Sequence, residues 1–207
     1  MLPPPYRIES ERLIIRCWDP RDAPLLKDAV DTSLDHLRPW MPWAHLEPQT
    51  IDEKIALLRS FRSRFDAGDD FVFGVFSSDE REVFGGSGLH RRVGDRAFEI
   101  GYWLRASALG RGLATEMTAA LTRVAFEICE VDRVEIRVDA GNERSLNVPR
   151  RLDYVEEARL RRRLPAASPG DPPGDAVIFS MIEEEFIAST AAATPLVAYD
   201  AAGGKLI

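Results

Sequence analysis

Alternating and continuous apolar runs predict the strands of this chain. Residues 12–18 and 133–139 alternate between apolar and polar positions, as half-buried strands do. Residues 71–76 (FVFGVF) are a continuous apolar run, which fits a buried strand. The other predicted strands are 82–93, 96–104, 154–164 and 176–182, with Gly94-Asp95 as a tight hairpin turn between the first two.

Helical periodicity and helix-end signals predict four helices. The helix at 19–30 begins with Asp-Pro, an N-cap followed by a proline. The helix at 50–68 begins with Thr-Ile-Asp-Glu, which has the spacing of a capping box, and ends at a glycine. Apolar residues recur with helical spacing through 113–129, and a short helix is predicted over 143–152.

The predicted order of elements is β-α-α-β-β-β-α-β-α-β-β. It indicates an α+β fold with a mixed, mostly antiparallel sheet of six or seven strands flanked by about four helices. Three successive strands before a glycine-rich turn disfavour a doubly wound parallel sheet. We assign residues 8–186 to this domain. We assign 187–207, which are rich in alanine, to an appended tail outside the core.

Composition excludes several classes of protein. The chain has 207 residues, of which 45% are hydrophobic and 29% charged, as in a soluble globular domain. It has neither an apolar run of membrane-spanning length nor the pattern of a secretory signal, so we expect a cytoplasmic protein without a membrane partner. Two cysteines predict reduced thiols, and three histidines without ligand spacing predict no metal site.

The charge balance narrows the range of partners. The net charge is −7 and the isoelectric point is about 5.1, which disfavours nucleic acid as a partner. An acidic protein attracts cations, so amines and basic peptides are better candidates. The sequence leaves open whether the chain forms a homodimer.

A glycine-rich turn stands where a predicted strand meets a predicted helix. The segment reads Leu109-Gly110-Arg111-Gly112-Leu113-Ala114-Thr115. Two glycines let the backbone approach a ligand closely, and the free N–H groups of a helix N-terminus suit phosphate or pyrophosphate. Tight packing of a helix on a sheet requires the same small residues, so the turn alone decides nothing.

Several motifs in order resemble the GNAT N-acetyltransferases, and within them the RimJ/RimL branch. They are Glu11–Arg16, the Pro-Trp-Met-Pro-Trp block at 39–43, Glu99–Leu104, Gly110–Glu116, Asn142-x-x-Ser145 and Leu152–Tyr154. The resemblance covers roughly residues 8–186. It implies the GNAT fold, acetyl-CoA as co-substrate, and direct transfer of the acetyl group to a primary amine.

The resemblance also implies the residues that hold the cofactor. The pantetheine arm would lie along Trp103, Leu104 and Arg105, and Asn142 and Ser145 would contact it. The pyrophosphate would lie on the turn Leu109, Gly110, Arg111, Gly112, Leu113, Ala114 and Thr115. The family's turn has Gln or Arg at position 109, and we expect leucine there to weaken binding modestly, because backbone N–H groups hold most of the phosphate. Asn142 and Ser145 are also ordinary helix-capping residues.

Two residues are the candidates for catalysis. Many GNAT enzymes have a tyrosine seven residues after this asparagine to protonate the leaving thiolate, but Pro149 stands there, so Ser145 is the candidate acid. Glu99 matches a carboxylate that takes the amine's proton through water. An outward-facing polar residue of an alternating strand is a nearly equal interpretation of Glu99. The oxyanion would meet the N–H of Trp103 or Leu104.

The acceptor amine is the open part of the prediction. Trp40, Trp43 and Tyr102 would line its pocket, although the two tryptophans fit core packing under a loop equally well. The loop 165–175 would set specificity. A protein N-terminus and a small-molecule amine both fit. The alternative is a non-catalytic acyl-CoA-binding module, which the departures at Leu109, Pro149 and Asp153 keep open.

Overall fold

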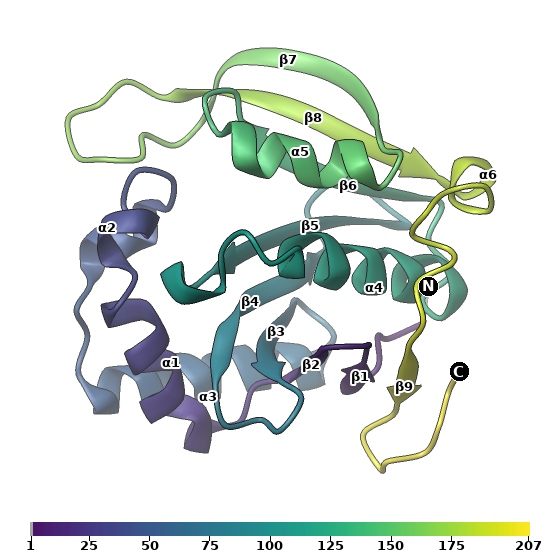
Figure 1. Ribbon diagram of the computed structural model, residues 1–207, viewed down its shortest axis with the longest axis horizontal. Coiled ribbons are helices and arrows are strands. Elements are labelled where there is room, and N and C mark those ends of the chain that lie inside the picture. Colours follow the sequence, from purple (N-terminus) through teal and green to yellow (C-terminus); the bar gives the residue numbers. More distant parts are fainter. Residues whose placement is uncertain (1) are drawn as a thin grey trace.

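The structure is a computed structural model that describes residues 2–207. In these residues one sheet has nine strands in the order β7-β8-β6-β5-β4-β3-β2-β1-β9 (Figure 1). All neighbouring pairs are antiparallel except β5 and β6. The strands are β1 (Arg7–Glu9), β2 (Leu13–Cys17), β3 (Phe71–Ser77), β4 (Val83–His90), β5 (Ala97–Leu104), β6 (Arg133–Asp139), β7 (Val155–Leu164), β8 (Gly174–Ile182) and β9 (Val197–Tyr199).

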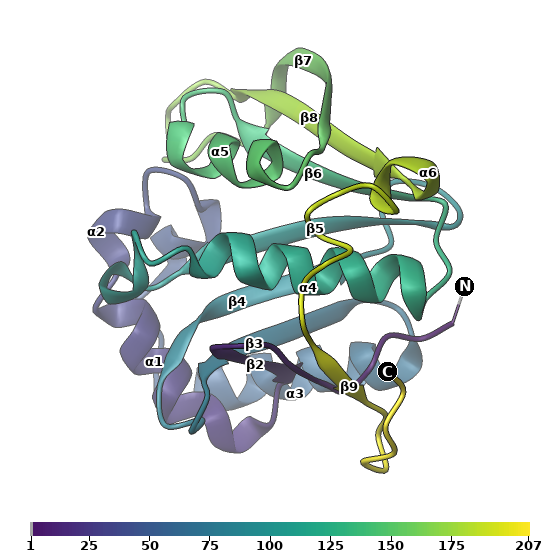
Figure 2. The same ribbon diagram turned by 45° about the vertical axis from the view of Figure 1, so that its right-hand side comes forward.

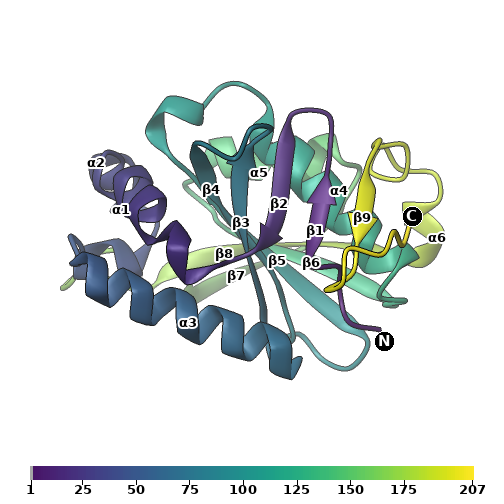
Figure 3. The same ribbon diagram turned by 90° about the horizontal axis from the view of Figure 1, so that it is seen from below.

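Helices cover both faces of the sheet. The helices α1 and α3 pack on one face, and α4 and α5 lie on the other (Figure 3). The α-helices are α1 (Ala23–Asp31), α2 (Leu34–Leu37), α3 (Ile51–Ala67), α4 (Leu113–Glu127), α5 (Glu143–Arg151) and α6 (Glu183–Phe186). Three short 3₁₀ helices, η1 (Pro20–Asp22), η2 (Pro42–Leu46) and η3 (Ala106–Ala108), complete the set.

The α+β class with a mixed sheet is confirmed, but the sheet has nine strands rather than six or seven. The two additional strands, β1 and β9, have three residues each, which is too short for alternation to be detected. The predicted start and end of the helix at 50–68 agree with the structure. Thr50 and Glu53 form the reciprocal capping box of α3, and Gly68 ends that helix with φ 76°.

The segment 187–207 packs against the domain, in contrast to the predicted tail outside the core. Its strand β9 pairs with β1 and extends the sheet. Upstream of β9 the chain crosses α4 (Figure 2), where Arg123 donates to the carbonyl of Thr194. Ala191 and Ala198 are fully buried, because their small side chains fit the narrow space beside the core.

The connection between β4 and β5 is longer than the predicted two-residue turn. β4 ends at His90 and β5 begins at Ala97, because side chains hold the intervening backbone away from the ladder. Arg91 donates to the carbonyl of Gly68, and Arg133 donates to that of Val93.

Residues 2–207 include no helix with both the length and the apolarity needed to cross a membrane. The same residues hold no group of three or more His, Cys, Asp or Glu side chains placed to bind a metal ion.

Candidate active site

Strands β5 and β6 are parallel and pair only at their first three residues. The last pair is Glu99 with Glu135, after which β5 continues along β4 while β6 stays paired with β8. The N–H of Arg105 donates to the carbonyl of Phe84 on β4. Because backbone groups alternate in direction along a strand, the N–H groups of Tyr102 and Leu104 point to the open side. This splay exposes the backbone that the sequence predicted for the pantetheine arm, and it makes Leu104 a better oxyanion donor than Trp103.

The glycine-rich turn links the end of β5 to α4. Gly110 and Gly112 have φ values of 73° and 77°, in the left-handed region where a side chain is strained. Gly112 is the N-cap of α4, so the first N–H groups of that helix are free of intrahelical partners. Leu109 is partly buried and packs against the main core. The turn therefore has the geometry of an anion site built from backbone.

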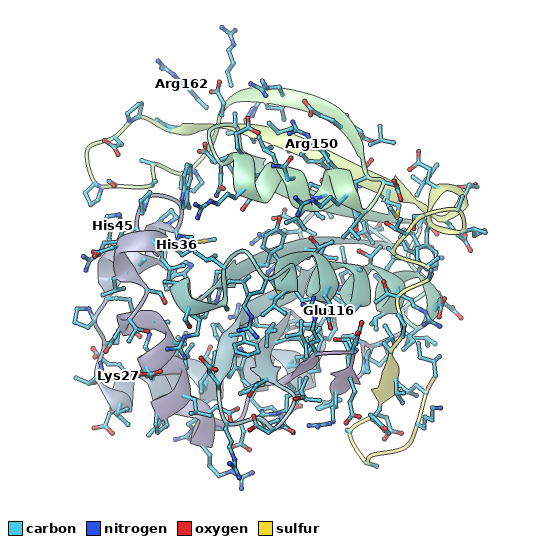
Figure 4. The ribbon with its side chains drawn as sticks, viewed as in Figure 1. Lys27, His36, His45, Glu116, Arg150 and Arg162 are labelled. Atoms are coloured by element: carbon cyan, nitrogen blue, oxygen red, sulfur yellow. The ribbon has the colours of Figure 1, made fainter. Side chains whose placement is uncertain are left out.

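The side chain of Glu116 braces this turn, a role that sequence reasoning missed. Figure 4 shows Glu116 on α4. Its carboxylate accepts hydrogen bonds from the hydroxyl of Ser10 at 2.8 Å and the N–H of Arg12 at 2.9 Å. The partners of Glu116 lie more than 100 residues away, so the sequence could not show these contacts. Its one sequence signal is its position directly after the glycine-rich turn.

A hollow of about 430 Å³ lies beside the turn. Gly112 and Thr115 line it from the turn and α4, and Arg12 and Arg151 line it from neighbouring segments. Pro195 adds a wall from the C-terminal segment. The hollow thus joins the predicted phosphate turn to parts of the chain that carry no functional motif.

Asn142 and Ser145 lie at the start of α5, across the splay from β5. The side chain of Asn142 accepts from the N–H of Ser145 at 3.1 Å, which is an N-cap bond. The hydroxyl of Tyr102 donates to the carbonyl of Ser145 at 3.1 Å. Burial raises the pKa of Tyr102 above its ordinary value. Tyr102 therefore faces α5, and its place in the acceptor pocket stays a prediction.

The departures near α5 have structural reasons. Pro149 is buried inside α5. Asp153 replaces a glycine and has φ 65°, the left-handed conformation expected for it. Tyr154 is buried with its hydroxyl 2.6 Å from that of Thr122, so it packs in the core. The departures at Pro149 and Asp153 leave the splay and the turn intact.

The predicted acceptor tryptophan Trp43 lies beside β5 on the face opposite α4. The rings of Trp43 and Trp103 are 5.7 Å apart in an edge-to-face arrangement. Trp40 lies near Gly141, just after β6. The guanidinium of Arg105 pairs with Asp28 at 3.0 Å on this same face, so its side chain points away from the cofactor position. Arg111 is exposed and its guanidinium lies 5.0 Å from the Phe84 ring.

Glu99 is buried at the point where the splay opens. Its Oε1 lies 2.5 Å from the guanidinium of Arg92, and its Oε2 lies 3.2 Å from that of Arg137. Its role as base stays a prediction, as does that of Ser145 as acid.

Comparison with known proteins shows which family the chain belongs to. The model of the acetyltransferase (GNAT) domain matches residues 12–155, more than half of the chain. The chain belongs to the GNAT acetyltransferase family. This GNAT N-acetyltransferase has its relatives in the RimJ/RimL branch, as the resemblance implied.

Three relatives illustrate this placement. The [ribosomal protein uS5]-alanine N-acetyltransferase of Escherichia coli is 27% identical over 159 residues, 74% of this chain and 80% of that protein. Mycobacterium smegmatis RimJ in complex with CoA-disulfide has a TM-score of 0.81 at 24% identity, covering 92% of this chain and 94% of that one. RimL, a ribosomal L7/L12 α-N-protein acetyltransferase in complex with coenzyme A, has a TM-score of 0.74 at 20% identity, covering 84% and 95%.

Proposed function

We propose that this chain transfers the acetyl group of acetyl-CoA directly to the α-amino group of a protein N-terminus. The observation that carries the proposal is the splay of β5 from β6 leading into the Gly110–Gly112 turn at the start of α4. A strand edge holds an extended amide-containing arm, and a helix N-terminus holds a pyrophosphate. Acetyl-CoA has both parts in that order. The hollow beside the turn suits the adenosine end.

The face that carries Trp40 and Trp43 supports the position of the acceptor. An amine that enters there meets the thioester from the side opposite α4, and the exposed edge of β5 supplies N–H groups for the oxyanion. The nitrogen lone pair forms the C–N bond, and collapse of the tetrahedral intermediate breaks the C–S bond. The thiolate then takes a proton, which we assign to the Ser145 hydroxyl. The uS5-alanine and L7/L12 acetyltransferases among the relatives favour a protein acceptor over a small amine.

Two measurements test the proposal. Isothermal titration should detect acetyl-CoA binding, and absence of heat at millimolar ligand would contradict the cofactor assignment. Release of CoA thiol should then be followed across a panel of N-terminal peptides, the same peptides with a blocked N-terminus, and small amines. We expect thiol release only with free N-termini. Binding without thiol release from any acceptor would favour the non-catalytic module, and release only with small amines would reassign the acceptor.

A further inference from the structure

A histidine and an aspartate form a close pair on the acceptor face of the sheet. Asp70 directly precedes β3 and His90 ends β4, and Nδ1 of His90 lies 2.7 Å from Oδ1 of Asp70. Both side chains are about one-fifth exposed, so solvent and a ligand reach them. A carboxylate that accepts from Nδ1–H fixes the tautomer in which Nε2 carries a free lone pair. In residues 2–207, Nε2 has no hydrogen-bonding partner of its own.

The imidazole ring lies over two glycines next to the splay. A Cβ atom placed on Gly88 would lie 2.6 Å from Nε2, and one placed on Gly101 would lie 3.4 Å from it. Side chains at these two positions would displace the ring. Gly101 is two residues beyond Glu99, where the pairing of β5 with β6 ends. The lone pair of His90 therefore lies at the inner end of the splay, on the β5 segment that leads to the predicted oxyanion donor Leu104.

The carboxylate of Glu99, next to His90, is held in ion pairs. Glu99 is the cross-strand partner of His90, and each of its oxygens is engaged by a guanidinium, from Arg92 and from Arg137. These ion pairs tie Glu99 to β6 and to the β4–β5 connection. Of the two candidates on this face, His90 is the one with a basic atom free to meet an amine.

We propose that His90 is the catalytic base that removes the proton of the acceptor amine, and that Asp70 is a positioning residue that orients it. The inference rests on the proposed acetyl transfer. As the amine nitrogen forms its bond to the carbonyl carbon, its proton passes to Nε2 of His90. The carbonyl electron pair moves to oxygen, then returns as the C–S bond breaks and the thiolate leaves. The imidazolium afterwards gives its proton to water, and water returns a proton to the Ser145 oxygen, which gave its own to the thiolate.

The charges around the pair suit this role. Burial acts to raise the pKa of Asp70, but the hydrogen bond and charge of His90 and the guanidinium groups of Arg64 and Arg92 hold it below its ordinary value. Asp70 thus stays ionised at neutral pH and stabilises the imidazolium that forms. The charged groups facing the pair are Arg64 on α3, Arg92 on the β4–β5 connection and Glu99 on β5.

The test compares His90→Gln, Asp70→Asn and Glu99→Gln in a peptide acetylation assay. General base catalysis is typically worth ~10²–10⁴-fold, so His90→Gln should lower kcat/KM for the peptide by at least about 100-fold at pH 7. The dissociation constant for acetyl-CoA should change less than about twofold. Asp70→Asn should lower the plateau of the pH–rate profile and move its midpoint to lower pH, because the imidazolium loses its counter-charge. His45→Gln, in the 3₁₀ helix η2, is the matched control and should behave as the wild type.

Chemical rescue distinguishes a catalytic role of His90 from a structural one. His90→Ala leaves space over Gly88 and Gly101, so added imidazole should restore part of its turnover, whereas a merely structural histidine gives no such rescue. A His90→Gln variant within about threefold of wild type, or a loss confined to Glu99→Gln, would overturn the inference while acetyl transfer stands. A wild-type protein that acetylates nothing in the panel would overturn both.

Discussion

The guanidinium Nε of Arg12 lies 2.6 Å from Oε2 of Glu116, and Nη1 of the same group lies 2.8 Å from the carbonyl oxygen of Arg111. One side chain just before β2 thus holds both the first turn of α4 and the glycine-rich turn before it. A backbone anion site works only when its N–H groups are already aimed, because ordering them on binding costs free energy. The pair keeps the turn in its binding conformation.

Glu116→Gln should therefore weaken acetyl-CoA binding without removing a contact to the ligand. Hydrogen bonds to charged groups contribute about 1.5–3 kcal/mol, so we expect the dissociation constant to rise at least about 10-fold, measured by isothermal titration. Glu127→Gln is the matched control, because Glu127 pairs with Arg123 at 2.9 Å at the far end of the same helix. Equal dissociation constants for the two variants would show that the turn needs no such brace.

Gly112→Val should remove most of the affinity for acetyl-CoA. A left-handed backbone costs a non-glycine residue about 1–2 kcal/mol, and a branched side chain also blocks the approach of a phosphate. Gly68→Val is the control, since Gly68 has nearly the same φ of 76° at the end of α3 and nothing within 4 Å of an added Cβ. Both variants should lose stability in thermal unfolding, but only Gly112→Val should lose binding. Parallel loss of binding in both would assign the effect to strain.

Ser145→Ala should lower kcat more than it raises KM for acetyl-CoA. Its hydroxyl is assigned to the departing thiolate, which carries full charge only late in the reaction. The N-cap bond from its backbone N–H to Asn142 survives the change, so α5 should fold normally. Steady-state kinetics with a peptide acceptor check this, with Ser78→Ala in the exposed β3–β4 turn as control. A change in KM alone would make Ser145 a binding contact only.

The two cysteines should resist thiol reagents in the native protein. Burial raises the pKa of both Cys17 and Cys129 to about 12, and the thiolate is the reactive form. At pH 8 only about one thiol in 10⁴ is ionised, and neither sulfur meets solvent freely. Titration with a chromogenic disulfide should count two thiols in guanidinium chloride and none within minutes in buffer. Rapid reaction of one native thiol would contradict the burial.

Local features of the sequence were enough to predict the glycine-rich turn at the start of α4. The glycines predict the turn because few other residues adopt a left-handed backbone at the start of a helix. The capping box and the buried strand 71–76 are predictable because they depend on neighbours within a few residues. The same locality explains why Asp153 could be expected to adopt its left-handed conformation. Periodicity gave the order of the main elements, and with it the α+β class.

Tertiary structure decided the acceptor side. Asp70 meets His90 only because β3 and β4 are adjacent, and Glu99 is engaged by two arginines from separate segments. Arg12 reaches Glu116 across more than 100 residues, and the alanine-rich segment 187–207 joins the sheet through β9. Hydrophobic patterning records which face of an element is buried, but it does not record which polar side chains meet across strands. That pairing depends on the register of the whole sheet.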